Sequence, residues 1–131
     1  MFEALIFSGS SIVHAIWISE VLNPSPGSTV TVTTRTVMGA GLKDPRDALA
    51  AASPYLRMFS LVTAGWLMAR QALAAVAALE PDGADTELLQ AKIGTARFFC
   101  EQLLPAVHGL VPAATASADA LFALDPSGLG G

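Results

Sequence analysis

The sequence predicts an all-α fold built on a long antiparallel helical hairpin, and two observations support this prediction. Apolar residues recur at spacings of three, four and seven between Pro54 and Glu80, which is the period of one helix face. A second periodic segment runs from Asp85 to about Leu110, and the connection over residues 81–84 is too short for any other arrangement. The stripe on the first helix consists of Tyr55, Phe59, Val62, Trp66 and Leu73.

Composition indicates that this fold does not cover all of its own apolar surface. The 131 residues are 53% hydrophobic and 14% charged, with a mean hydropathy of +0.54; typical soluble proteins have about 25% charged residues. A single domain of this size buries a modest core. We therefore expect the excess surface to meet a partner, a second copy or lipid, with a homo-oligomer as the simplest outcome.

Charge and cysteine content narrow the classes of function. A net charge of −4 with seven Lys and Arg argues against a nucleic-acid partner, which needs a clustered basic surface. Cys100 is the single cysteine, so an intrachain disulfide and a cysteine-based metal site are excluded. We interpret Cys100 as a small buried hydrophobe, and a reducing cytoplasmic location fits its isolation.

A membrane span is the less favoured interpretation of the two most apolar segments. Residues 2–22 contain several polar side chains and lack a preceding basic residue, so they resemble neither a signal peptide nor a good span. Leu61–Leu79 is more apolar, but Arg70 lies near its middle, where a charge costs about 2.5–3.5 kcal/mol on insertion scales.

The segment before the hairpin, residues 1–38, differs in character from the rest. Asn23–Gly27 is a turn, and Ser28–Val37 alternates threonine and valine, which predicts a β-strand. Its partner would be Leu5–Leu22 in a hairpin, although the latter pattern is compatible with either helix or strand. We therefore leave open a β-hairpin, or a helix plus a strand.

Helix-start signals flank the hairpin. Asp44 as N-cap, Pro45 at the first helical position and Asp47 one turn later predict a short helix that runs through Ala52. Pro54 then either restarts or kinks the helix.

The second helix of the hairpin has its own expected features. Asp85 is its expected N-cap, and Arg97 and Glu101 form an i,i+4 pair. Pro105 should bend it near Glu101. A weaker third helix is expected over residues 113–124, followed by a flexible tail at residues 125–131.

Lys92 is the residue that the helical pattern does not explain, because it falls in the centre of the apolar face of the second helix. An ammonium there must extend outward to solvent, pair with a carboxylate or lose its proton. The first helix offers Glu80 at its far end, so we hypothesise that a paired Lys92 would find its partner outside the hairpin.

The sequence contains no recognisable catalytic signature, and we assign no catalytic, cofactor-binding or metal-binding residue. Nucleotide loops, HExxH and GxSxG are absent. His14 and His108 are isolated, and His108 is interpreted as lying near a helix C-terminus, where it would interact with the helix dipole. Trp66 and Arg70 are one turn apart and predict a cation–π contact, with Trp66 in the core. Ser10 and Ser11 lack a neighbouring base.

Residues 39–124 resemble the C-terminal helical domain of acyl-CoA dehydrogenase-like flavoenzymes, in particular the large 3-methylmercaptopropionyl-CoA dehydrogenase type. Two segments carry the resemblance, DPRDALAAASPYLRMFSLVTAGWLMARQALAA and AKIGTARFFCEQLLPAV. The matching pieces, in the family's order and spacing, are Pro54-Tyr55-Leu56, Ala64-Gly65-Trp66, Lys92, Ala96, Phe98-Phe99 and Pro105.

The resemblance implies a family of oxidoreductases of fatty acid metabolism that act on CH–CH bonds with FAD. In such enzymes the flavin, the acyl-CoA and the catalytic carboxylate belong to a larger upstream core, which residues 1–37 do not match, so no catalytic residue is carried over. The resemblance implies a detached or truncated C-terminal domain that serves helix packing or oligomerisation, on itself or on a flavoenzyme core, and holds no cofactor of its own. The alternatives are dehydrogenase activity with a separate core, and a membrane-associated hairpin.

Overall fold

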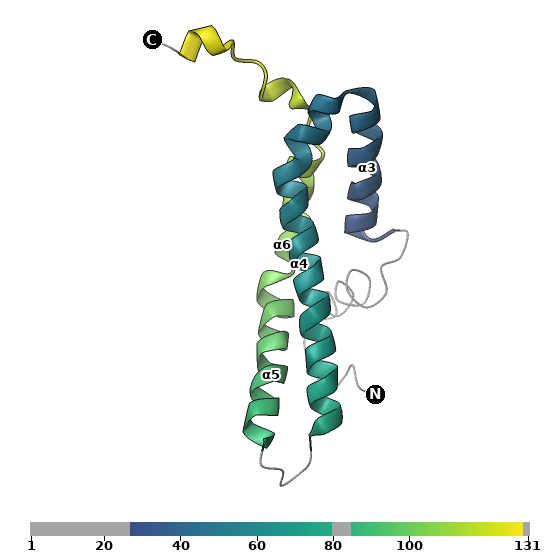
Figure 1. Cartoon of the computed structure of the whole chain (residues 1–131), viewed down its shortest axis with the longest axis vertical. Helices are drawn as coiled ribbons and strands as arrows, with labels where there is room; N and C mark the ends of the chain where they lie inside the picture. The colour runs from purple at the N-terminus through teal and green to yellow at the C-terminus, as the bar shows by residue number, and fades with distance from the viewer. Residues whose placement is uncertain (1–26, 80–84, 130–131) are drawn as a thin grey trace.

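The computed structural model describes residues 27–79 and 85–129, and this part of the chain is all-α, which confirms the predicted fold class (Figure 1). A long central helix, α4, is flanked by α3 on one side and by the antiparallel α5 and α6 on the other. The elements are α3 (Thr29–Lys43), α4 (Pro45–Ala78), α5 (Thr86–Phe98), the π-helical turn η2 (Phe99–Leu103), α6 (Ala106–Ala114), and the 3₁₀ turns η3 (Ala118–Ala120) and η4 (Pro126–Leu129).

The antiparallel hairpin is present, and its first helix is longer than predicted. α4 begins at Pro45 and continues through Pro54 without interruption, so the predicted end of a short helix at Ala52 is wrong. Asp44 caps it as expected, because its carboxylate accepts the backbone N–H of Arg46 at 3.0 Å. Asp85 stands at the N-cap of α5, although its side chain makes no capping hydrogen bond.

The predicted strand over Ser28–Val37 is wrong, because this segment forms most of α3. Its threonines satisfy their hydroxyls within a helix: Thr34 and Thr36 donate to the carbonyls one turn earlier, at 2.7 and 3.0 Å. The Ser28 side chain caps the first turn by accepting from the Thr31 N–H. Packing against α4 and α6 therefore overrides the β-propensity of the valine and threonine pattern. The predicted partner segment, Leu5–Leu22, lies outside the described residues.

The fully buried residues of α4 are mostly small, and the predicted stripe lies at the edge of the core, where Tyr55 and Val62 are partly buried against it. α4 buries Ala51, Met58, Gly65, Ala69, Ala72 and Ala75. The opposite side of the core consists of Cys100 in η2, Leu104 between η2 and α6, and Val107 in α6, all of which are buried. The alanines and Gly65 let the axes approach closely, and Met58, Leu104 and Val107 fill the space between them. The burial of Cys100 confirms its interpretation as a core residue.

The second helix is interrupted where Pro105 was expected to bend it. The amide of Leu104 reaches back to the carbonyl of Phe99 at 3.0 Å, which is the five-residue spacing of a π-turn. Pro105 has no N–H for the carbonyl of Glu101, so the regular ladder must be broken there. The Arg97–Glu101 ion pair predicted beside this point is present at 2.7 Å.

The C-terminal part differs from the predicted third helix over residues 113–124. α6 continues through Pro112 to Ala114, and a single 3₁₀ turn, η3, follows after residues 115–117. His108 is consequently near the start of α6, and its predicted position at a helix C-terminus is wrong. The imidazole Nδ1 lies 3.3 Å from the Thr29 hydroxyl, so it joins α6 to the first turn of α3.

Candidate functional site

The two acidic residues at the start of α4, Asp44 and Asp47, make structural contacts. Asp44 forms an ion pair with Arg46 at 2.6 Å, and hydrogen bonds from this arginine lower the pKa of the Asp44 carboxyl from its ordinary value of 3.8. Asp47 accepts the backbone N–H of Ala118 at 2.8 Å and so anchors η3 to the first turn of α4. The sequence did not indicate this second contact, because the two residues are 71 positions apart.

The remaining polar candidates also lack a catalytic arrangement. Arg70 lies over the ring of Trp66 at 4.8 Å, which confirms the predicted cation–π contact. The indole is 40% exposed, so its expected place in the core is wrong. Lys92 is half-buried, and within the described residues no carboxylate lies within ion-pair distance of its ammonium. Over the same residues, no group of His, Cys, Asp and Glu could hold a metal ion.

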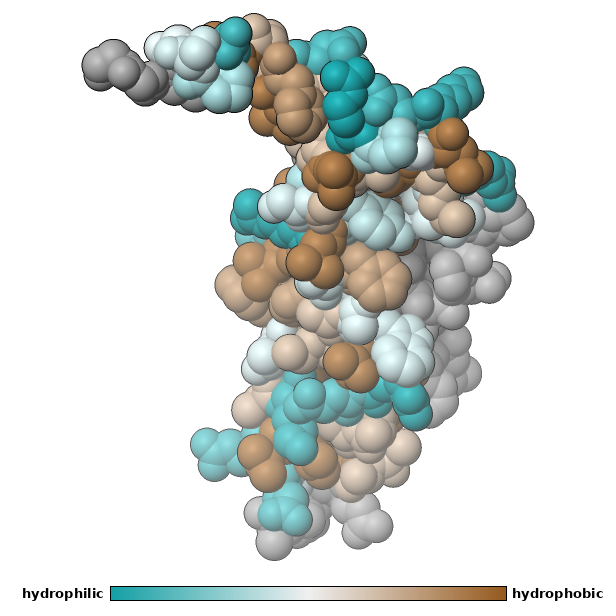
Figure 2. Space-filling model, turned by 45° about the horizontal axis from the view of Figure 1, so that its top comes forward, coloured by the Kyte–Doolittle hydropathy of each residue, from teal (hydrophilic) through white to brown (hydrophobic). Residues whose placement is uncertain are grey.

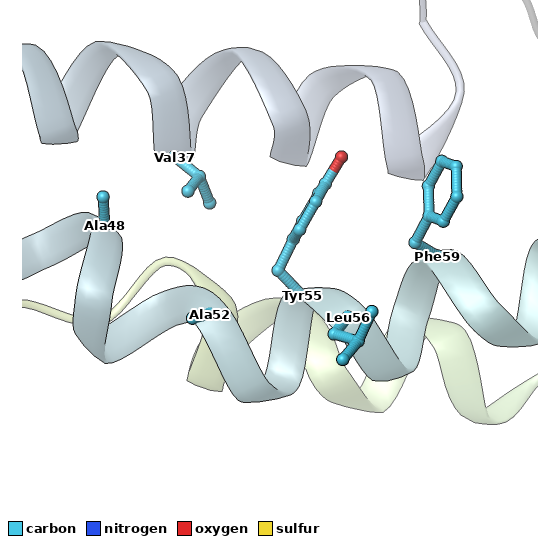
Figure 3. Close-up of a pocket in the computed structure, with 6 residues that line it drawn as sticks. All are labelled: Val37, Ala48, Ala52, Tyr55, Leu56 and Phe59. Carbon is cyan, nitrogen blue, oxygen red and sulfur yellow. The ribbon is translucent and has the colours of Figure 1, made fainter.

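An apolar hollow between α3 and α4 is the feature best suited to bind something (Figure 3). It has a volume of about 600 Å³ and is lined by Val37, Ala48, Ala52, Tyr55, Leu56 and Phe59. Tyr55 points from α4 toward α3, where its hydroxyl is 2.8 Å from the hydroxyl of Thr34. Thr34 lines a second hollow on α3, together with Met38 and Leu42, so the two hollows meet at this hydrogen bond.

The two hollows are bordered by large apolar side chains that are open to solvent. We call this surface the α3/α4 face. Met38, Leu42, Leu56 and Phe59 line the hollows, and Leu49 follows the lining residue Ala48; all five are between 52% and 87% accessible. Figure 2 shows brown apolar residues spread over the outside of the molecule and not confined to its interior. A surface of this kind marks an interaction site more often than it marks a stable solvated face.

The hollow between α3 and α4 does not fit a flavin or a nucleotide, because the arginine of the α3/α4 face, Arg35, lines the second hollow instead. Among the described residues that line the hollow between α3 and α4, Tyr55 supplies the polar side chain, and Thr34 already bonds its hydroxyl. A dinucleotide needs cations or a free helix N-terminus for its pyrophosphate. The N-terminus of α4 is instead capped by the Asp44 carboxylate, which would repel a phosphate.

Sequence reasoning missed the α3/α4 face for an identifiable reason. Leu49, Ala52, Leu56 and Phe59 recur at helical spacing, but so do the residues of several other sectors of α4. The side of α4 that is covered depends on where α3 and α6 pack, and the spacing of residues within α4 does not indicate this. α4 is also long and apolar enough to cross a membrane by length and composition alone, with 22% of its most apolar window buried.

The fold defines a small helical domain that presents an apolar surface and no assembled catalytic centre among its described residues. Comparison with known proteins identifies its class: residues 28–125 match the family described as Acetyl-CoA dehydrogenase C-terminal like, and the chain belongs to this family. The predicted resemblance over residues 39–124 is thereby confirmed. The match also includes all of residues 28–38, which the sequence pattern assigns to a separate segment. FAD is the cofactor of the family's full-length enzymes.

A particular relative is similar over part of the chain. It is the 3-methylmercaptopropionyl-CoA dehydrogenase of Ruegeria pomeroyi, 44% identical over 62 residues, which are 47% of this chain and 10% of the relative. The similarity thus spans about a tenth of the length of that protein. No solved structure matches the chain.

Proposed function

We propose that this chain is a packing module, a C-terminal helical domain of acyl-CoA dehydrogenase type that binds a protein surface and performs no catalysis alone. The α3/α4 face carries this proposal, because it leaves large side chains of two adjacent helices open to water. Burying one Leu, Met or Phe side chain contributes about 1.5–3 kcal/mol. Covering several of them together is therefore strongly favourable, whether the cover is a flavoenzyme core or a second copy.

The chemistry of the described side chains is consistent with packing. Asp44 and Asp47 act as caps and anchors, His108 bonds to Thr29, and Glu101 pairs with Arg97. Each of these groups has a structural partner, and they are spread along the length of the bundle. Catalysis by general acids and bases would need such groups to converge within hydrogen-bond reach of one substrate atom.

The proposal is tested by purifying the full chain and measuring flavin, turnover and mass together. We expect no flavin absorbance near about 450 nm, a band that comes from the cofactor's own chemistry. We also expect no acyl-CoA-dependent reduction of an electron-accepting dye. Substitution of the matched pair Leu56→Ser/Phe59→Ser should reduce association with the partner, whether that partner is an added flavoenzyme core or a second copy.

A second function is carried by the similarity to the R. pomeroyi enzyme. In this alternative the chain completes an FAD-dependent acyl-CoA dehydrogenase whose core is a separate polypeptide. Adding the purified chain to such a core would then raise turnover, and the Leu56→Ser/Phe59→Ser variant would not. Turnover that is unchanged at saturating chain, with binding intact, would leave packing as the function.

The length and apolarity of α4 keep a membrane-associated hairpin as a third candidate. Arg46, Arg57 and Arg70 divide this helix at intervals of about three turns, which makes insertion costly. Cell fractionation without detergent decides between membrane insertion and packing on a soluble protein. Recovery of the chain in the soluble fraction contradicts insertion, and recovery in the membrane fraction contradicts packing on a soluble partner.

A further inference from the structure

We propose that the occupant of the α3/α4 face is a C-terminal arm, residues Leu121–Leu124, from a second copy of this chain. The inference rests on the proposed packing function and names its partner. Leu121, Phe122 and Leu124 are each more than half exposed, and they lie between Ser117 and the η4 turn. In Figure 1 this yellow segment extends away from the helices on the side opposite α3.

The arm is held at its root, which sets its direction. Asp47 fixes Ala118 through the 2.8 Å hydrogen bond, and Ala118 is buried. Arg46 lies over one face of the Phe122 ring at 5.7 Å and leaves the ring 55% exposed. The amides of Leu121 and Phe122 also bond the carbonyl of Ala118, at 2.9 and 3.2 Å. An apolar arm whose root is fixed in this way loses less conformational entropy on binding than a free tail would.

The arm of one copy leaves from the wrong side to reach its own α3/α4 face. At 100° per residue, Asp47 lies on the same side of α4 as the buried Ala51 and Met58, and Met58 shares the core cluster with Val107 and Ala114 of α6. Leu49 and Leu56 lie on the opposite side of α4. The arm and the face of one molecule therefore point apart, and a second molecule is needed to bring an arm to a face.

The charges of the two surfaces are complementary. α3 contains no acidic residue and α4 contains none after Asp47, whereas Arg35 lines the second hollow and Arg70 lies further along α4. The arm is flanked by Asp119 and Asp125, and the sequence contains no Lys or Arg after Arg97. Complementary charges at the rim favour this pairing and its register, while the apolar side chains supply the affinity.

Reciprocal exchange of two arms gives a closed assembly. If each copy inserts its arm into the face of the other, both faces and both arms are used, and a twofold dimer results. One-way insertion would leave a free arm and a free face at the ends and would build an open chain of molecules. Reciprocal exchange therefore predicts a closed dimer and no larger assembly.

The test uses the full chain and three pairs of substitutions at exposed positions, which are not expected to unfold it. The arm variant is Leu121→Ser/Leu124→Ser, and the face variant is Leu56→Ser/Phe59→Ser. The control is Leu88→Ser/Phe98→Ser on α5, which changes the same residue types as the face variant at similar exposure. Circular dichroism confirms folding, and sedimentation equilibrium gives the mass.

We expect the wild type and the control to have twice the chain mass of 13.5 kDa. Either the arm or the face variant should raise the dimer dissociation constant on the order of 100-fold or more, since each removes four apolar side chains from the dimer. An equimolar mixture of the two variants should recover a heterodimer, because the intact arm of one meets the intact face of the other. That recovery is specific to an arm-in-face contact.

Three results would overturn the inference. The first is a monomeric wild type at about 100 μM, far above the dissociation constant of a specific dimer; packing on a flavoenzyme core would then be tested separately by adding that core. The second is a dimer that the face variant dissolves and the arm variant does not, which supports packing through the α3/α4 face while excluding the arm. The third is the absence of a heterodimer in the mixture.

Discussion

The carboxylate of Asp47 accepts the backbone N–H of Ala118 at 2.8 Å and joins the first turn of the central helix to a residue 71 positions later. Asp47, which the sequence pattern assigns to the first turn of a helix for its interaction with the helix dipole, thus also makes a tertiary contact. It also satisfies the amide of a residue that is 1% exposed, and such an amide would otherwise lose its water without gaining a partner.

Replacing Asp47 with Ala should therefore lower the free energy of unfolding by about 1–3 kcal/mol, the cost of an unsatisfied buried donor. Asp47→Asn keeps an oxygen acceptor and should restore most of the loss. Asp119→Ala is the control, because it removes an exposed hydrogen bond from the Ser117 hydroxyl and leaves the Ala118 amide paired; it should change stability by about 0.5 kcal/mol or less. Urea titration followed by circular dichroism measures all three. Equal losses for Asp47→Ala and Asp119→Ala would show that the anchor contributes nothing.

The end of α3 lies close to the start of α4 at Gly41, where an added Cβ would lie 2.7 Å from the Cβ of Ala48. Gly41→Ala should destabilise the chain by about 1–3 kcal/mol, as expected for overpacking between two helices. Gly39 has open space around it. Gly39→Ala should stabilise by about 0.5–1 kcal/mol, because alanine has the higher helix propensity. Thermal unfolding of the pair tests the packing, and shifts of the same sign would contradict it.

The hydroxyls of Thr34 and Tyr55, 2.8 Å apart, connect the two helices that form the α3/α4 face. We expect Tyr55→Phe to cost about 0.5–1.5 kcal/mol, the net contribution of one hydrogen bond. The double-mutant cycle with Thr34→Val should give a coupling energy of the same size. A coupling near zero would mean that the two hydroxyls are satisfied independently by water.

Lys92 is a cation that the helical pattern places on the apolar face of α5. It is half-buried on α5, and no described carboxylate pairs with it. Lys92→Met keeps a long apolar side chain and removes the ammonium, so we expect the isolated chain to gain up to about 1 kcal/mol of stability. A loss of stability in denaturant titration would instead indicate a carboxylate partner within the chain.

How much of the fold the sequence predicts depends on the kind of signal. Predictions that rest on residues within one or two helical turns are confirmed. They are the Asp44 cap, the Arg97–Glu101 ion pair, the Trp66–Arg70 contact and the interruption before Pro105. Those signals depend on backbone geometry that neighbouring side chains determine.

The errors came from features that depend on tertiary contacts. The valine–threonine alternation of α3 predicts a strand until α4 and α6 supply a surface for it to cover as a helix. The aromatic stripe predicts the core of α4, yet apart from Met58 the fully buried residues of this helix are small ones such as Ala69 and Ala72. The size of an apolar side chain on α4 does not indicate whether it is buried, because close helix packing favours small side chains at the contact. The α3/α4 face could not be located for the same reason.

The ion pair between Asp44 and Arg46 gives the fold a defined response to acid. The arginine lowers the pKa of the Asp44 carboxyl in the folded chain below its ordinary value of 3.8, so the unfolded chain binds the proton more tightly. The contribution of this pair to stability is therefore fully present above about pH 4 and is lost as the pH falls through the folded-state pKa. Arg46→Gln removes the cause, so the Asp44 pKa should rise toward 3.8 and the response to acid should weaken. Carboxyl NMR titration of both proteins, with Asp125 as an internal reference whose pKa is lowered by Ser127 alone, measures the change. An Asp44 pKa that is the same in both proteins would show that the backbone N–H of residue 46, which both retain, holds the carboxylate without help from the arginine side chain.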